Sequence, residues 1–139
     1  MSALPAALRR LVRERAAFRC EYCLLAEDDA YLPHEPDHVI ALKHGGLTDA
    51  SNLALACFDC NRFKGSDIAS IDADDGRLTS LFNPRTAVWA EHFRTAAGKV
   101  VPLTSVGRVT VALLQMNLSP RVEVRDELTR LGRWPHSRK

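Results

Sequence analysis

Five apolar residues recur at helical spacing near the start of the chain: Leu4, Leu8, Leu11, Val12 and Ala16. This pattern predicts an amphipathic helix over residues 4–17. Pro5 falls in the first turn, where proline is tolerated because the backbone N–H has no helical partner there. The arginines of this segment lie mainly on the opposite face.

Two short apolar segments follow, separated by a polar turn. Residues 34–42 predict a strand that ends near the turn at residues 43–46, and residues 52–56 predict the returning strand. A short helix is expected to begin near Asp59 and to end at Gly65, because glycine commonly follows the last turn of a helix. The order of elements is therefore strand, loop, strand, helix.

Turn signals divide the second half of the chain. Polar clusters at residues 72–76 and 83–84 predict boundaries, and residues 96–99 predict a hairpin turn. We therefore expect a core of residues 1–71, which includes the N-terminal helix, and an accessory region of residues 72–139 packed on it as one structural unit.

Two apolar series at helical spacing predict two helices in the accessory region. The first series follows Thr104, a candidate N-cap, and the second follows a Ser-Pro pair at residues 119–120. The two series are Val106, Val109, Leu113 and Met116, and then Val124, Leu128 and Leu131. Gly132 is expected to end the last helix and to leave residues 134–139 as a tail.

The composition fits one small α+β domain. With 139 residues, 46% of them hydrophobic, the chain can bury a modest core that a bound metal would help to stabilise. No apolar run approaches the length of a membrane span, and the first residues lack the apolar core of a signal peptide. We therefore expect a cytoplasmic protein without a membrane partner.

The net charge of +2 hides two locally basic ends. Arginine pairs bidentately with phosphate, which favours contacts from these ends to a nucleic acid, although a GC-rich genome would also favour arginine. The basic residues at the two ends are Arg9, Arg10, Arg13, Arg15, Arg19, Arg121, Arg125, Arg130, Arg133, Arg138 and Lys139.

Four cysteines form two Cys-x-x-Cys pairs, Cys20 with Cys23 and Cys57 with Cys60. Each spacing lets a tight turn direct two thiolates at one ion, and four thiolates fill a tetrahedral zinc shell without room for water. The pattern predicts a structural zinc ion. Two disulfides or four unrelated thiols are the alternatives, which a reducing compartment disfavours.

Residues suited to phosphodiester hydrolysis lie between and beside these pairs. Histidine is the side chain best suited to accept a proton at physiological pH, so His38 is a natural general base. The adjacent Asp37 is a hard oxygen ligand for an ion such as Mg²⁺, and Asn61 offers a second oxygen from the predicted helix. Such a site would leave coordination positions open for water and phosphate.

The stretch from Cys20 to Lys64 resembles the HNH endonucleases of the His-Me finger group, whose fold is the ββα-metal core. The resemblance rests on the two cysteine pairs, Asp37-His38, the Gly-Gly turn, Asn52, and Asn61 followed by Lys64-Gly65. It implies that His38 is the base, that Asp37 and Asn61 hold the catalytic metal, and that Asn52 orients the base or braces its loop. The family often has histidine at the two metal positions, so oxygen ligands here favour Mg²⁺ or Mn²⁺.

Each of these residues also has a simpler interpretation. Asp37 could be a surface carboxylate and His38 a half-buried histidine bonded to backbone, while Asn52 and Asn61 could only cap a turn and a helix. Lys64 could contact a phosphate or be solvated. Three further histidines have no assigned role, although the first of them is expected to be structural: His34, His44 and His92.

The resemblance implies a metal-dependent endonuclease that hydrolyses phosphodiester bonds in DNA, by nicking if one chain acts alone. RNA is also compatible as a substrate. The main alternative is a catalytically inactive, zinc-stapled module that binds nucleic acid, and a weaker one is a protein-interaction domain in which zinc only supports the fold.

Overall fold

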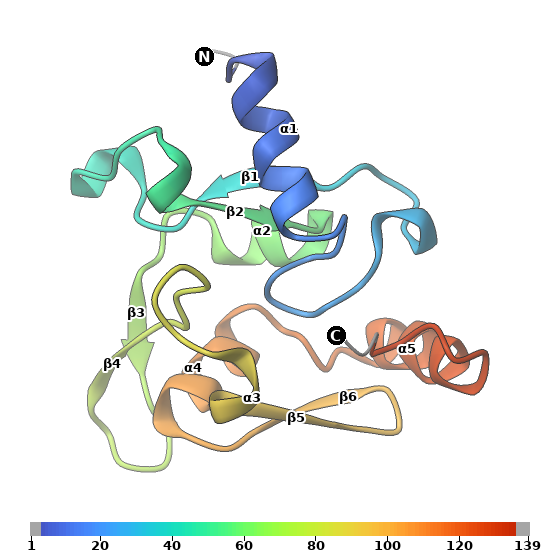
Figure 1. The fold of residues 1–139 in the computed structure, drawn as a ribbon. Helices are drawn as coiled ribbons and strands as arrows, with labels where there is room; N and C mark the ends of the chain where they lie inside the picture. Colours follow the sequence, from blue (N-terminus) through green and yellow to red (C-terminus); the bar gives the residue numbers. More distant parts are fainter. Residues whose placement is uncertain (1–3, 136–139) are drawn as a thin grey trace.

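The computed structural model describes residues 4–135. Its first half contains the expected helix, two strands and second helix: α1 (Ala6–Arg15), β1 (Glu35–His38), β2 (Leu53–Ala56) and α2 (Phe58–Lys64). The two strands pair antiparallel, with His38 opposite Leu53, and α2 follows directly (Figure 1). The predicted ββα arrangement within an α+β protein is therefore confirmed.

Strand β2 is buried on both faces because α1 covers one of them. Leu53 and Leu55 pack with Val12 and Ala16 of α1 in a small apolar cluster. The alternate residues of the strand, Ala54 and Ala56, belong to the larger core on the other side, together with the four cysteines. Side chains alternate across a strand, so one short strand joins the N-terminal helix to the cysteine cluster.

The first strand is shorter than predicted, since it ends at His38 and not near residue 42. The reason is Asn52, whose side chain takes the place of a partner strand. Its Oδ1 accepts a hydrogen bond from the N–H of Ile40 (2.9 Å), and its Nδ2 donates to the carbonyl of Ile40 (2.9 Å). With both backbone groups of Ile40 occupied, the chain leaves the sheet and enters a 3₁₀ turn, η2 (Leu42–His44).

Helix α2 begins beside the second cysteine pair, as predicted. Cys57 is its N-cap, and the Cys57 sulfur accepts a hydrogen bond from the backbone N–H of Cys60. Gly65 follows the helix with a φ of 53°, a conformation that favours glycine. The same cysteine therefore starts the helix and belongs to the cysteine cluster.

From residue 69 onward the chain contains the predicted hairpin and helices, and also a second hairpin and a short helix that were not predicted. The hairpin is β5 (Phe93–Ala96) with β6 (Lys99–Pro102), and the helices are α4 (Ser105–Leu113), capped by Thr104, and α5 (Ser119–Arg130). The unpredicted elements are the hairpin of β3 (Ala69–Ile71) with β4 (Leu78–Ser80) and the short helix α3 (Trp89–His92). The first half of the chain contains two further 3₁₀ turns, η1 (Glu27–Asp29) and η3 (Ala50–Asn52).

Helix α5 buries a face that only partly matches its apolar pattern, since Leu128 packs against the core but the other two apolar residues do not. Val124 is 47% exposed and Leu131 is 64% exposed, whereas Arg121 and Arg125 are buried. The prediction that residues 134–139 form a tail is also wrong for its first residue. Trp134 is buried, and its indole N–H donates to the carbonyl of Cys23 (2.9 Å); residues 136–139 lie outside the described residues.

One buried apolar cluster contains residues from both halves of the chain, among them Tyr22, Ala54, Phe82, Val109 and Trp134. In Figure 1 the elements up to α2 lie above α3, α4 and α5. The expected boundary after residue 71 lies inside a hairpin, at the end of β3, because residues 72–76 form the turn between β3 and β4. That boundary stays a prediction. None of the helices within residues 4–135 has the length and apolar character needed to cross a membrane.

Candidate active site and metal centre

The four cysteine sulfurs lie within 4.8 Å of one another, and all four residues are buried. They are free thiols, so the disulfide alternative does not apply. A tetrahedral shell with Zn–S bonds of about 2.3 Å places neighbouring sulfurs about 3.8 Å apart. The sulfurs of Cys23 and Cys57 are 3.7 Å apart, which suits that geometry. The cluster can therefore hold one zinc ion.

Backbone N–H groups surround the sulfurs in the manner of metal-binding turns. The N–H groups of Tyr22 and Cys23 donate to the sulfur of Cys20, each at 3.4 Å, and the N–H of Cys60 donates to Cys57. Such bonds stabilise thiolates, which are the form that binds zinc. Burial raises the pKa of Cys20 and Cys60, so binding of zinc releases protons.

A second site lies on the other side of α2. Asp37, His38 and Asn61 line one surface hollow of about 270 Å³, with Gly65 at its edge. The two strand residues reach it from the end of β1, and Asn61 reaches it from the first turns of α2. The three residues selected from the sequence are thus neighbours in space.

The Asp37 carboxylate is buried and has two polar partners. Tyr22 donates its hydroxyl to Oδ2 (3.0 Å), and the Lys64 ammonium lies 3.1 Å from the same oxygen. Burial raises the pKa of Asp37 above its ordinary value, although Lys64 and Tyr22 act in the opposite direction. Burial and the neighbouring carboxylate also raise the pKa of Tyr22, which keeps its hydroxyl a donor.

Lys64 does not have the exposed position that we considered for it. Its side chain is 1% exposed, and its ammonium also donates to the carbonyl of His38 (3.1 Å). The solvated alternative is wrong, and the ammonium is directed at Asp37 and not at the surface. Lysine can bury its charge here because a carboxylate and a carbonyl both accept from it.

The candidate base is oriented by a residue that the sequence did not indicate. Nε2 of His38 lies 2.8 Å from the Thr48 hydroxyl. When Nε2 carries the proton and donates it to Thr48, the Nδ1 lone pair is left to accept a proton. No spacing rule connects Thr48 with His38, because the contact depends on the path of the intervening loop.

Asn52 holds that loop in place with three hydrogen bonds. Besides its pair of bonds to Ile40, its Nδ2 donates to the carbonyl of Leu47 (2.9 Å). Gly46 is required in the same turn, because a Cβ there would lie 1.7 Å from the Ile40 carbonyl oxygen. The geometry fits a bracing role for Asn52.

The other three histidines within residues 4–135 lie outside this hollow. His34 is fully buried, and its Nε2 contacts the carbonyl of Leu25 (2.8 Å), which fits the expected structural role. His44 is exposed in η2. Nδ1 of His92 lies 2.7 Å from the Thr104 hydroxyl in the accessory region.

Most of the arginines near the two ends have partners inside the protein, among those within residues 4–135. The expected contacts of these ends with phosphate stay a prediction. Arg9, Arg13, Arg130 and Arg133 pair with carboxylates, while Arg15, Arg121 and Arg125 donate to backbone carbonyls. Arg138 and Lys139 lie outside the described residues.

Comparison with known proteins supports the family resemblance. Residues 20–67, about a third of the chain, match the HNH endonuclease family model. This span contains the four cysteines, the candidate active-site residues and the complete ββα unit. No curated protein and no solved structure matches the chain.

Proposed function

We propose that this protein is a metal-dependent HNH endonuclease that hydrolyses phosphodiester bonds in DNA and nicks one strand at a time. The match to the family model makes a nuclease-type domain the starting point. The proposal rests on one observation: Asp37, His38 and Asn61 line the same hollow beside α2. A carboxylate, an imidazole and an amide oxygen are the groups that the reaction needs there.

In this proposal the Nδ1 atom of His38 accepts a proton from the water that attacks phosphorus. A new P–O bond forms, the bond to the sugar 3′-oxygen breaks, and that oxygen takes up a proton from solvent. Asp37 and Asn61 would hold a divalent ion, Mg²⁺ or Mn²⁺, which would stabilise negative charge on the phosphate and the leaving oxygen. The four cysteines would hold zinc as a structural ion, in a reducing cytoplasm that keeps their thiols available.

The test is incubation of purified protein with supercoiled plasmid and Mg²⁺ or Mn²⁺. We expect His38→Ala to keep the fold and to lose cleavage by about 10²–10⁴-fold, the usual contribution of a positioned general base. His92→Gln is the matched control, since that imidazole lies in the accessory region outside the hollow. Equal cleavage by His38→Ala and the parent would refute the assignment of the base.

A zinc-stapled module that binds nucleic acid without cutting it is the second candidate. The observation in its favour is the ion pair of Asp37 with Lys64, which neutralises a proposed metal ligand. This alternative predicts DNA binding that does not depend on Mg²⁺ or Mn²⁺, with intact plasmid under every metal condition. Cleavage that depends on His38 would exclude it.

A further inference from the structure

Two buried arginines face the cysteine cluster from the accessory region. Arg121 and Arg125 lie one turn apart on α5 and are 9% and 2% exposed. Arginine is rarely buried without a compensating group, because removing its charge from water is costly. The two guanidinium groups therefore require negative charge or hydrogen-bond acceptors nearby.

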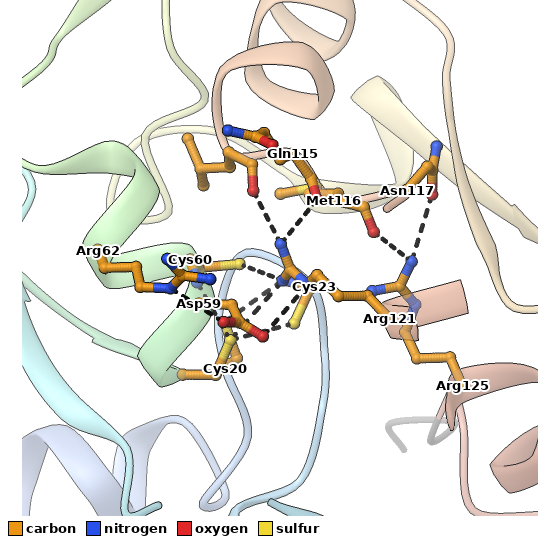
Figure 2. Close-up of polar contacts among 12 residues, drawn as sticks. Cys20, Cys23, Asp59, Cys60, Arg62, Gln115, Met116, Asn117, Arg121 and Arg125 are labelled. Carbon is orange, nitrogen blue, oxygen red and sulfur yellow. Dashed lines mark hydrogen bonds and ion pairs between the residues drawn. The ribbon is translucent and has the colours of Figure 1, made fainter. Parts of the chain in front are cut away.

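Arg121 contacts the sulfurs directly. Its Nη2 lies 3.0 Å from the sulfur of Cys60 and 3.8 Å from that of Cys57 (Figure 2). Its Nη1 donates to the carbonyls of Leu114 (2.8 Å) and Gln115 (3.0 Å), which hold the guanidinium in this direction. The fork of this side chain thus joins the end of α4 to the cysteine cluster.

Arg125 supports the same arrangement from the next turn of the helix. It donates to the carbonyls of Gly98 (2.7 Å) and Met116, and its guanidinium lies 5.2 Å from the centre of the Trp134 ring. The indole N–H of Trp134 in turn donates to the carbonyl of Cys23. Both arginines are therefore connected to the cysteine turns, one directly and one through a tryptophan.

Carboxylates supply only part of the missing negative charge, because Asp59 is shared with Arg62. Among residues 4–135 the one ion pair of Arg121 is with Asp59, at 3.8 Å, and Arg125 has none. Carbonyls, an amide oxygen and an aromatic ring complete the contacts of Arg125, and none of these is an ion. Four thiolates around Zn²⁺ carry a net charge of −2, which matches two guanidinium groups.

We propose that Arg121 and Arg125 are the counter-charges of the zinc tetrathiolate. They connect helix α5 to the zinc site and slow the release of zinc. The inference rests on the assignment of zinc to the four cysteines, but not on nuclease activity. Hydrogen bonds and charges around metal ligands commonly change metal affinity by about 10–100-fold when removed. Because Cys57 caps α2 and Cys60 lies on it next to Asn61, the contact also links the accessory region to the helix of the candidate active site.

The experiment compares zinc-loaded parent protein with Arg121→Met, Arg121→Lys and Arg125→Met. The matched control is Arg130→Met, because Arg130 lies on the same helix, is exposed and pairs with Asp126 and Glu127. The rate of zinc transfer to an excess of a chromogenic chelator is measured below the unfolding temperature. We expect transfer to be about tenfold faster in Arg121→Met, intermediate in Arg121→Lys, and unchanged in Arg130→Met.

Cobalt substitution provides a readout that a purely structural role would not change. Loss of the N–H···S bond makes the sulfur easier to oxidise, so the sulfur-to-cobalt charge-transfer band of Arg121→Met should shift to longer wavelength. Arg121→Lys keeps the charge and should shift the band less; it also serves as the test if Arg121→Met does not fold. Transfer rates and spectra equal to those of the parent would overturn the proposal. Absence of zinc from the folded parent would instead refute the zinc assignment on which it rests.

Discussion

The ammonium of Lys64 lies 3.1 Å from Oδ2 of Asp37, and both side chains are almost completely buried. This ion pair joins the end of α2 to the end of β1 at the base of the candidate active site. Lys64 thereby neutralises the carboxylate that we propose as a ligand of the catalytic ion. The pair has consequences for both stability and metal binding.

Lys64→Met should destabilise the protein by about 3–5 kcal/mol, because it leaves a buried carboxylate without its counter-charge. Urea unfolding in buffer without added Mg²⁺ or Mn²⁺ measures the loss. Arg62→Met is the control, since Arg62 is an exposed cation on the same helix and should change stability by less than about 0.5 kcal/mol. Equal losses in the two variants would contradict the importance of the pair.

Removal of Lys64 should also increase the stabilisation that Mn²⁺ provides. A divalent ion at Asp37 would supply the positive charge that Lys64→Met lacks, and a ligand that binds the folded state alone stabilises it. The shift in melting temperature on addition of Mn²⁺ should be larger in Lys64→Met than in the parent. A Mn²⁺-induced shift in melting temperature as large in Arg62→Met as in Lys64→Met would show that the effect comes only from the change in net charge.

Thr48→Val should lower cleavage by about threefold to tenfold, which corresponds to the loss of one hydrogen bond that orients the base. The fold and the zinc content should not change, because Thr48 is exposed. Single-turnover cleavage of a labelled duplex measures the effect. A loss as large as that of His38→Ala would mean that Thr48 has a role beyond orientation.

Asn52→Asp should unfold the loop between β1 and η3 more easily than it affects the rest of the protein. Aspartate has nearly the same shape but cannot donate to the carbonyls of Ile40 and Leu47, so we expect a loss of about 1–3 kcal/mol. Hydrogen exchange of the amides of residues 39–47 should accelerate. Asp49→Asn is a control in the same loop, and normal protection in Asn52→Asp would exclude the bracing role.

Elemental analysis should find one zinc ion per chain, and Cys57→Ser should lower both zinc content and melting temperature. Cys57 combines the roles of metal ligand and N-cap of α2, so its loss affects the metal and the helix that carries Asn61. Phe58→Ala, which changes an exposed neighbour at the start of the same helix, is the control. A Cys57→Ser protein with the parent's melting temperature would argue against a structural metal.

The product on supercoiled plasmid should be open-circular DNA before linear DNA. Residues 4–135 contain one hollow lined by Asp37, His38 and Asn61, and one such set hydrolyses one strand at a time. Linear DNA should rise more steeply with enzyme concentration if two chains act together across a two-fold axis. Direct conversion to linear DNA at the lowest active concentration would show instead that the protein works as a preformed dimer.

The order of elements in the ββα unit could be read from the sequence because its signals are local. Cysteine spacing, the Gly-Gly turn and the glycine after α2 act within a few residues, and the structure confirms the cluster and the helix that they predicted. Thr104 likewise predicted the start of α4. Local backbone geometry and short-range hydrogen bonds determine such features.

Tertiary packing decided which side chains are buried and with which partners. The apolar pattern of α5 indicated Val124, Leu128 and Leu131, yet Val124 and Leu131 are exposed and the helix buries Arg121 and Arg125. Sulfurs far away in sequence accept from Arg121, and backbone carbonyls accept from Arg125. Lys64 on α2 is buried for a similar reason, since its partner Asp37 lies on strand β1. The free energy of a buried charge depends on groups that only the folded chain brings together, and no local pattern records them.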